Sequence, residues 1–223
     1  YCLSEYEMRK AGDLINAYLR EGRLAANRSQ PIGAGSYGVV YASDVPGNVI
    51  KQKHGYGPDD FVTEADLQSI AADIGIAPRV AGVETFRGGV GDRIEMQDIR
   101  DNYEPVAGEG FPDDPKINVQ VAQQLGQLAL KGVRLEDRRA ANVVKNKMSG
   151  RPMQLDFGIA GKVEGSEQAA TLAMATAEGF EAAGLGDIAS IYRATVMDLL
   201  EGGDVADAMD VAKQGFSRLQ KIK

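Results

Sequence analysis

The chain has 223 residues, of which 43% are hydrophobic and 26% are charged, as in an ordinary globular protein. Its net charge of −7 argues against a nucleic-acid binder, because affinity for the phosphate backbone comes from clustered Lys and Arg. No apolar run reaches the roughly 18 residues of a membrane span, so we expect a soluble, intracellular protein without membrane insertion. The single histidine excludes a multi-histidine metal site, and the single cysteine excludes an internal disulfide.

The predicted elements change from strand-rich to helix-rich along the chain. Residues 5–20 place apolar side chains at helical spacing and predict a helix ahead of the main domain. Residues 30–53 predict a hairpin that opens with a glycine cluster, and residues 61–76 predict a helix with an apolar inner face. Residues 79–86 and 92–99 predict a second hairpin. The helix residues that we expect to face the core are Phe61, Ala65, Leu67 and Ile70.

A polar stretch over residues 101–115 is typical of a linker between two lobes. Beyond it, the pattern predicts a helix over 117–131, a short hairpin around Met148–Gly150, and mostly helix to the end. The chain begins with Tyr1, which suggests a larger parent chain. We therefore divide it into an N-terminal helical extension (1–29), an N-terminal lobe (30–100) and a C-terminal lobe (101–223).

A Gly-x-Gly-x-x-Gly motif lies in the first predicted hairpin. Glycines allow backbone amides to approach phosphate oxygens without a Cβ in the way. In a dinucleotide-binding fold these glycines join a strand to a helix, whereas here they join two strands. The motif therefore predicts a phosphate-binding loop, whose candidate residues are Gly33, Gly35, Ser36, Tyr37, Gly38 and Val40.

A lysine follows the apolar residues of the next predicted strand. Lys51 is the candidate for binding phosphates, and such a lysine needs a carboxylate to hold it in place. Glu64, on the helix that follows, is the candidate partner. Lys53 lies on the same strand face, so the choice between Lys51 and Lys53 stays open.

The strongest pattern combines two carboxylates and an amide. Asp137 lies five residues before Asn142, and Asp156, in the triplet Asp-Phe-Gly, follows fourteen residues after Asn142. Phosphoryl transfer from ATP needs one carboxylate to accept the proton of the acceptor hydroxyl. It also needs oxygen ligands for Mg²⁺, which a second carboxylate and an amide supply. The spacing therefore predicts an ATP-dependent phosphotransferase.

Over residues 30–203 these motifs resemble those of a eukaryotic-type protein kinase. The resemblance implies an α+β class, with a two-lobe protein-kinase-like fold made of a small β-rich N-lobe and a truncated helical C-lobe. It implies ATP and Mg²⁺, or Mn²⁺ in its place, and a protein substrate with a hydroxyl acceptor. Its catalytic residues would be Asp137, Arg139, Lys51 and Glu64, its metal ligands Asn142 and Asp156, and its gatekeeper and hinge residues Met96, Gln97 and Asp98.

Several positions depart from that family. Leu135 and Glu136 replace the usual His-Arg, so we expect no activation by loop phosphorylation. Between Gly158 and Asp187 no clear Ala-Pro-Glu is present, and Ala177–Gly179 echoes it faintly, so the peptide-binding segment is reduced. Asp187 would begin the helix whose carboxylate props the catalytic loop. The chain is similar to minimal kinases of bacterial type III effectors and phages, which implies delivery into a host cell. Because the activation segment is reduced, an activating partner is a further expectation.

Two other functions stay open. A small-molecule phosphotransferase of the aminoglycoside/choline-kinase kind also places Asp five residues before Asn. A nucleotide-binding pseudokinase remains an alternative because Leu135 and Glu136 replace the usual residues. The acceptor, Ser/Thr or Tyr, is undecided: Arg139 resembles the tyrosine-kinase pattern, but the segment that selects the acceptor is too short to compare.

Overall fold

The computed structural model describes residues 30–34, 38–53, 61–86 and 92–222, and the chain divides into two compact units. The first unit contains the residues up to Val62 together with Val80–Asp98. The second contains Thr63–Arg79 and the residues from Ile99 onward. The helix predicted over residues 5–20 lies outside the described residues, as do the loop residues Gly35, Ser36 and Tyr37.

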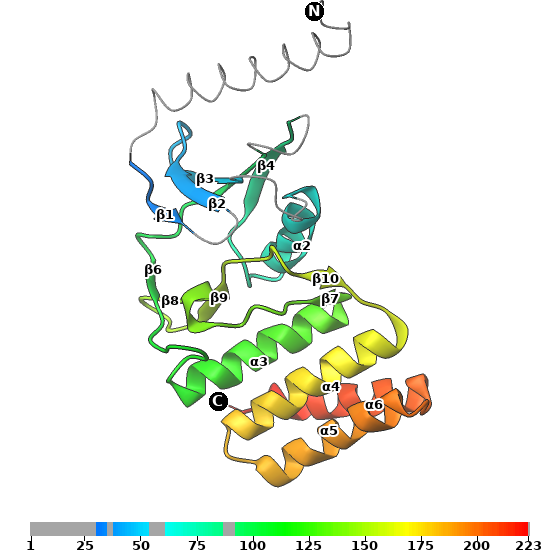
Figure 1. Ribbon diagram of the computed structural model, residues 1–223. Coiled ribbons are helices and arrows are strands. Elements are labelled where there is room, and N and C mark those ends of the chain that lie inside the picture. The colour runs from blue at the N-terminus through cyan, green and yellow to red at the C-terminus, as the bar shows by residue number, and fades with distance from the viewer. Residues whose placement is uncertain (1–29, 35–37, 54–60, 87–91, 223) are drawn as a thin grey trace, which may run out of the picture. The chain divides into compact units, whose positions relative to one another are not determined.

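The first unit is built on a five-stranded antiparallel sheet with the order β1-β2-β3-β5-β4 (Figure 1). Both predicted hairpins are confirmed. Glu95 on β5 accepts hydrogen bonds from Ser43 Oγ at 2.6 Å and from Asn48 Nδ2 at 3.1 Å, which ties the first hairpin to its neighbouring strand. The strands are β1 (Gly33–Ala34), β2 (Gly38–Ala42), β3 (Asn48–Lys53), β4 (Val80–Glu84) and β5 (Arg93–Gln97).

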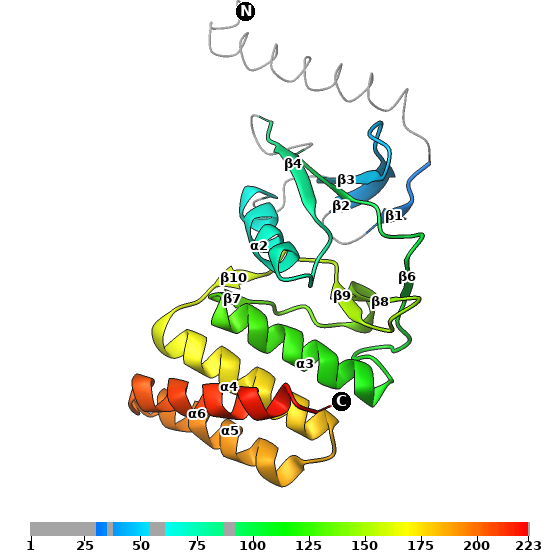
Figure 2. The same ribbon diagram turned by 180° about the vertical axis from the view of Figure 1, so that it is seen from behind.

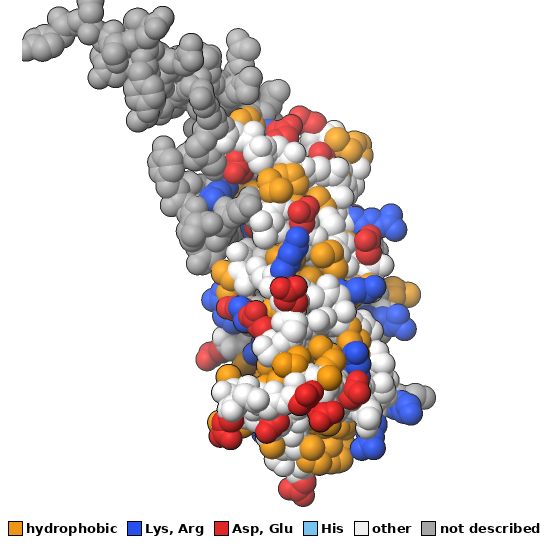
Figure 3. Space-filling view, turned by 90° about the vertical axis from the view of Figure 1, so that its right-hand side faces the viewer, with side chains coloured by type: hydrophobic (Ala, Val, Ile, Leu, Met, Phe, Trp, Pro, Cys, Tyr) orange, Lys and Arg blue, Asp and Glu red, His pale blue; other side chains and the backbone are white. Residues whose placement is uncertain are grey.

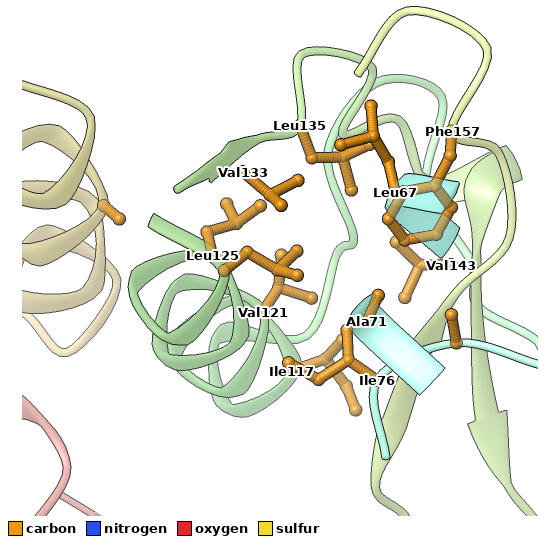
Figure 4. Packing of buried hydrophobic residues seen from close by; sticks show 13 residues of the cluster. Leu67, Ala71, Ile76, Ile117, Val121, Leu125, Val133, Leu135, Val143 and Phe157 are labelled. Carbon is orange, nitrogen blue, oxygen red and sulfur yellow. The ribbon is translucent and has the colours of Figure 1, made fainter. Parts of the chain in front are cut away.

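Helix α2 (Phe61–Asp73) ends three residues before its predicted end at residue 76. The helix stops because Gly75 adopts a φ of +75°, in the left-handed region that glycine tolerates and that closes many helices. Leu67 on α2 is buried in a cluster with Phe157 and residues of the second unit's helices, as Figure 4 shows. Although we assigned this segment to the N-terminal lobe, most of α2 groups with the second unit.

The second unit contains four long helices: α3 (Pro115–Leu130), α4 (Gly165–Ala182), α5 (Gly186–Leu200) and α6 (Val205–Leu219). Helix α4 packs against each of the other three, and Figures 1 and 2 show it from opposite sides. Asp114 and Asp204 cap α3 and α6, because their carboxylates accept hydrogen bonds from backbone amides of the first turn. The predicted helical C-terminal part is therefore confirmed.

Glycines allow these helices to approach closely. A Cβ at Gly126 on α3 would lie 2.1 Å from the ring of Phe216 on α6. A Cβ at Gly179 on α4 would lie 2.4 Å from Leu219, also on α6. Real side chains do not tolerate such distances, so close packing around α6 requires glycine at both positions.

Residues 101–115, which we predicted to be a linker, contain a strand. Strand β6 (Tyr103–Pro105) pairs with β8 (Val143–Asn146), which in turn pairs with β9 (Pro152–Gln154). These residues are therefore part of the second unit's structure. Three strand residues are too few to show the alternation of apolar and polar side chains that indicates a strand. The prediction therefore followed the polar composition of the segment.

None of the helices in the described part of the chain is long and apolar enough to cross a membrane. Figure 3 shows hydrophobic side chains interspersed with acidic and basic ones on one face of the molecule. Helix α5 exposes several large apolar side chains, namely Ile191, Met197 and Leu200.

Candidate active site

The β8–β9 hairpin brings the two predicted metal ligands to one end. Val143 pairs with Gln154 in this hairpin. At the adjacent position, beyond the strand ends, the Leu155 amide donates a 2.9 Å hydrogen bond to the Asn142 backbone oxygen. Asp156 follows directly. Asn142 also ends a short 3₁₀ helix, η1 (Ala140–Asn142). A tight turn at residues 147–149 thus determines that Asn142 and Asp156 leave the sheet at the same end.

Asp137 is held by a two-point ion pair within the same loop. The guanidinium of Arg139 donates from Nε at 2.7 Å and from Nη2 at 2.6 Å, one bond to each oxygen of Asp137. The Asp137 side chain is 15% exposed and that of Arg139 is 62% exposed. Asn142 Nδ2 donates to the Asp137 backbone oxygen at 3.4 Å. Three of the predicted site residues therefore meet in one loop of the second unit.

The hydrogen bonds from Arg139 lower the pKa of Asp137 below its ordinary value of 3.8, against the opposing effect of burial. Replacing Arg139 with Gln should therefore raise the pKa of Asp137, as a carboxyl-carbon NMR titration would show. The pKa of Asp137 is lower in the folded protein than in the unfolded protein, so the ion pair with Arg139 stabilises the fold when the pH is above the unfolded-state pKa. This stabilisation is lost as the pH falls through the folded-state pKa. The difference in unfolding free energy between wild type and Arg139→Gln should therefore shrink below pH 3.8.

Phe157 anchors the Asp-Phe-Gly triplet in the core. Its ring is buried in the cluster that contains Leu67 and Val143 (Figure 4). Asp156 lies partly exposed beside it and accepts a 3.1 Å hydrogen bond from the Gly158 amide. The buried ring therefore fixes the backbone from which the Asp156 carboxylate projects.

The donor set fits magnesium. Asn142 and Asp156 offer an amide oxygen and a carboxylate, and Mg²⁺ prefers few protein oxygens completed by water and phosphate. Within the part of the chain that the structure describes, no three His, Cys, Asp or Glu side chains form a metal-binding group.

Lys51 and Lys53 share one face of β3 in the first unit. Their Nζ atoms lie 5.6 Å and 5.9 Å from the centre of the Phe61 ring. Lys51 pairs across the sheet with Val40 and is partly exposed, whereas Lys53 pairs with Gly38 and is buried. A Cβ at Gly38 would lie 2.8 Å from the Gln52 backbone oxygen, so this close approach of the strands requires glycine. The geometry keeps both lysines as candidates.

The remaining predicted residues lie in different places. Glu64 is buried in the first turn of α2 and belongs to the second unit, so its ion pair with Lys51 stays a prediction. Met96 is buried near the end of β5, and Gln97, the last residue of that strand, is exposed. The backbone amide of Asp98 donates to the Gly47 oxygen at 2.8 Å, which ties this segment to the first hairpin.

Solved structures provide the comparison that decides the fold. A doubly substituted kinase domain of PknI from Mycobacterium tuberculosis aligns with a TM-score of 0.52 at 16% identity, covering 86% of this chain and 95% of that one. The chain has a protein-kinase-like fold. The kinase PK-1 of Cydia pomonella granulovirus also matches, at 13% identity with a TM-score of 0.49 and 74% of each chain covered. No protein-family model and no curated protein matches the sequence.

In this kinase-like fold, the segment after Asp-Phe-Gly is shorter than the sequence suggested. Helix α4 occupies residues 165–182, so only residues 159–164 separate Gly158 from a helix. Two of those six residues form β10 (Gly161–Lys162), which pairs with β7 (Val133–Arg134). The faint Ala-Pro-Glu echo at Ala177–Gly179 lies inside α4. A long peptide-binding segment over residues 158–187 is therefore absent from this described part of the chain.

The carboxylate that contacts the loop around Asp137 is not the predicted one. Asp187 lies exposed in the first turn of α5, which packs against α4 and α6. Glu178 on α4 instead forms an ion pair with Arg138, the residue between Asp137 and Arg139. Spacing alone did not reveal this pair, because its members are forty residues apart and no motif links one to the other.

The replaced His-Arg positions also have structural roles. Leu135 is buried in the same cluster as Phe157, so the loop begins from an apolar anchor. Glu136 binds Arg134 at 2.6 Å, within the segment that leads into the loop. The loop of this kinase-like fold is therefore attached by core packing and local ion pairs.

Proposed function

We propose that the chain is an ATP- and Mg²⁺-dependent protein kinase that transfers a phosphoryl group to a protein hydroxyl. The observation that supports this most is the convergence of Asp137, Asn142 and Asp156 around one end of the β8–β9 hairpin. Such a constellation is what phosphoryl transfer requires, because catalysis there consists mainly of positioning and charge stabilisation.

The depressed pKa of Asp137 defines its proposed role. A carboxylate with a low pKa is a weak base, so it removes a proton from a hydroxyl poorly in the ground state. In a loose transition state the hydroxyl becomes acidic only late, when its bond to phosphorus forms. Asp137 would therefore orient the acceptor hydroxyl first and take up its proton late.

The other residues would bind the nucleotide phosphates and the metal ion. Asn142 and Asp156 would hold Mg²⁺, which neutralises charge on the phosphates. Arg139 would stabilise negative charge on the transferring group, because its guanidinium is exposed and lies beside Asp137. Lys51, oriented by Glu64, would bind the nucleotide phosphates, and the glycine-rich hairpin would cover them.

A second function, a small-molecule phosphotransferase, is favoured by one specific feature. Only residues 159–164 lie between Gly158 and α4, which leaves little chain to bind a peptide next to the acceptor hydroxyl. A small alcohol needs no such platform.

The deciding assay uses γ-labelled ATP and Mg²⁺ with the whole chain, a generic protein mixture and a panel of small alcohols. We expect label on protein from the wild type and none from Asp156→Ala. Lys51→Ala and Lys53→Ala run in parallel, and the variant that loses both ATP binding and transfer identifies the phosphate-binding lysine. Label only on a small alcohol would favour the second function. ATP binding without transfer to any acceptor would reject both in favour of a pseudokinase.

A further inference from the structure

Two arginines of the segment leading into the catalytic loop are bound by the same helix. Arg134 pairs with Glu167, and Arg138 pairs with Glu178, both glutamates lying on α4. The glutamates are eleven residues apart, which is about three helical turns, so they lie on one face of α4. Helix α4 therefore contacts this segment at two points along its length.

The two pairs differ in their exposure to solvent. Both side chains of the Arg138–Glu178 pair are 28% exposed, whereas those of the Arg134–Glu167 pair are 41% and 50% exposed. Ion pairs that are partly withdrawn from water are screened less by solvent and salt than exposed ones. The pair at Arg138 is therefore the stronger restraint of the two.

Arg138 also lies closer in the sequence to the proposed catalytic residues than Arg134 does. It lies directly between Asp137 and Arg139, whose side chains bind each other and not Arg138. Within the described part of the chain, few backbone hydrogen bonds hold this loop. Among them, the Ala140 amide donates to the Gly110 oxygen at 2.6 Å, and the Asn142 amide donates to the Arg139 oxygen at 2.8 Å. The ion pair at Arg138 connects the loop to the helix that packs against all three other long helices.

We infer that Glu178 is a positioning residue, which holds the catalytic loop in a fixed position through its ion pair with Arg138. This inference rests on the proposed function, because Asp137 and Asn142 need fixed positions only if the loop carries the reaction. Helix α4 is a rigid support, with Ala175, Ala177 and Phe180 buried around Glu178. A shift of about 1 Å in reacting groups lowers rates by roughly a hundredfold, so a loop with few bonds gains much from such a restraint.

The test compares Glu178→Gln with the matched control Glu167→Gln, which removes the same charge from the same helix face. Steady-state kinetics give kcat and the KM for ATP. We expect Glu178→Gln to lower kcat roughly 10- to 100-fold with an unchanged KM for ATP. We expect Glu167→Gln to change kcat by about twofold or less, because its pair is more exposed. The reversed pair, Arg138→Glu with Glu178→Arg, should regain most of the lost rate.

Amide hydrogen exchange provides a second measurement that does not depend on activity. In Glu178→Gln, the amides of Ala140 and Asn142 should exchange faster than in wild type, while the amides of α3 stay protected. Wild-type kcat or wild-type exchange in Glu178→Gln would overturn the inference, as would an equal loss in Glu167→Gln. A wild type without transfer activity would reject the proposed function alone, and the exchange rates would still decide whether Glu178 positions the loop.

Discussion

Asp137→Asn should lower the rate of phosphoryl transfer by roughly 10²- to 10⁴-fold, the usual contribution of a positioned acid or base. The amide has nearly the same shape as the carboxylate but does not accept a proton from the acceptor hydroxyl. It also removes the charge that the Arg139 guanidinium binds at both oxygens. ATP affinity should be unchanged, because Asp137 is not among the proposed ligands of the metal or the nucleotide.

The control for Asp137→Asn is Asp210→Asn, which removes one carboxylate charge from an exposed position on α6. Single-turnover transfer with saturating ATP separates the chemical step from binding, and nucleotide titration gives the affinity. A rate within tenfold of wild type would exclude Asp137 from the reaction. A parallel loss in Asp210→Asn would show that net charge, and not the loop, controls the rate.

Phe216→Ala should lower the free energy of unfolding by about 3–5 kcal/mol, measured by urea denaturation. Phe216 is 2% exposed, and its ring lies against Gly126 of α3, where no side chain is available to fill the space left behind. Typical domains are stable by about 5–15 kcal/mol, so the variant should be close to unfolding at 37 °C.

Phe111→Ala is the matched control for Phe216→Ala. The Phe111 side chain is 66% exposed, so its removal should change the unfolding free energy by about 0.5 kcal/mol or less. Equal losses in the two variants would contradict the assignment of Phe216 to the core. A small loss at Phe216 would indicate that α6 contributes little to the stability of the second unit.

The central features of the site could be predicted because they depend on local sequence. Asn142 and Asp156 flank a short hairpin whose turn residues are visible in the sequence, so their proximity followed from the chain itself. The same holds for the glycine-rich hairpin around Gly38 and for the helix that carries Glu64. Each of these elements has a clear period or a clear turn.

The remaining features depend on contacts between distant residues. The Arg138–Glu178 pair joins a loop to a helix, and no spacing rule connects two residues forty positions apart. Helix α4 is rich in alanine and glycine, so it shows little contrast between apolar and polar faces, and the family resemblance assigned much of it to a peptide-binding segment. The family resemblance led us to choose Asp187 as the carboxylate that supports the catalytic loop. The packing of the helices instead leaves Asp187 exposed in the first turn of α5.

The β10–β7 pairing has a consequence for regulation. The six residues between Gly158 and α4 are Ile, Ala, Gly, Lys, Val and Glu, and none of them carries a hydroxyl group. The Val163 amide donates to the Gly132 oxygen at 2.8 Å, which adds to the two strand pairs already holding this segment. A phosphotransferase built in this way has no residue here for a second kinase to modify.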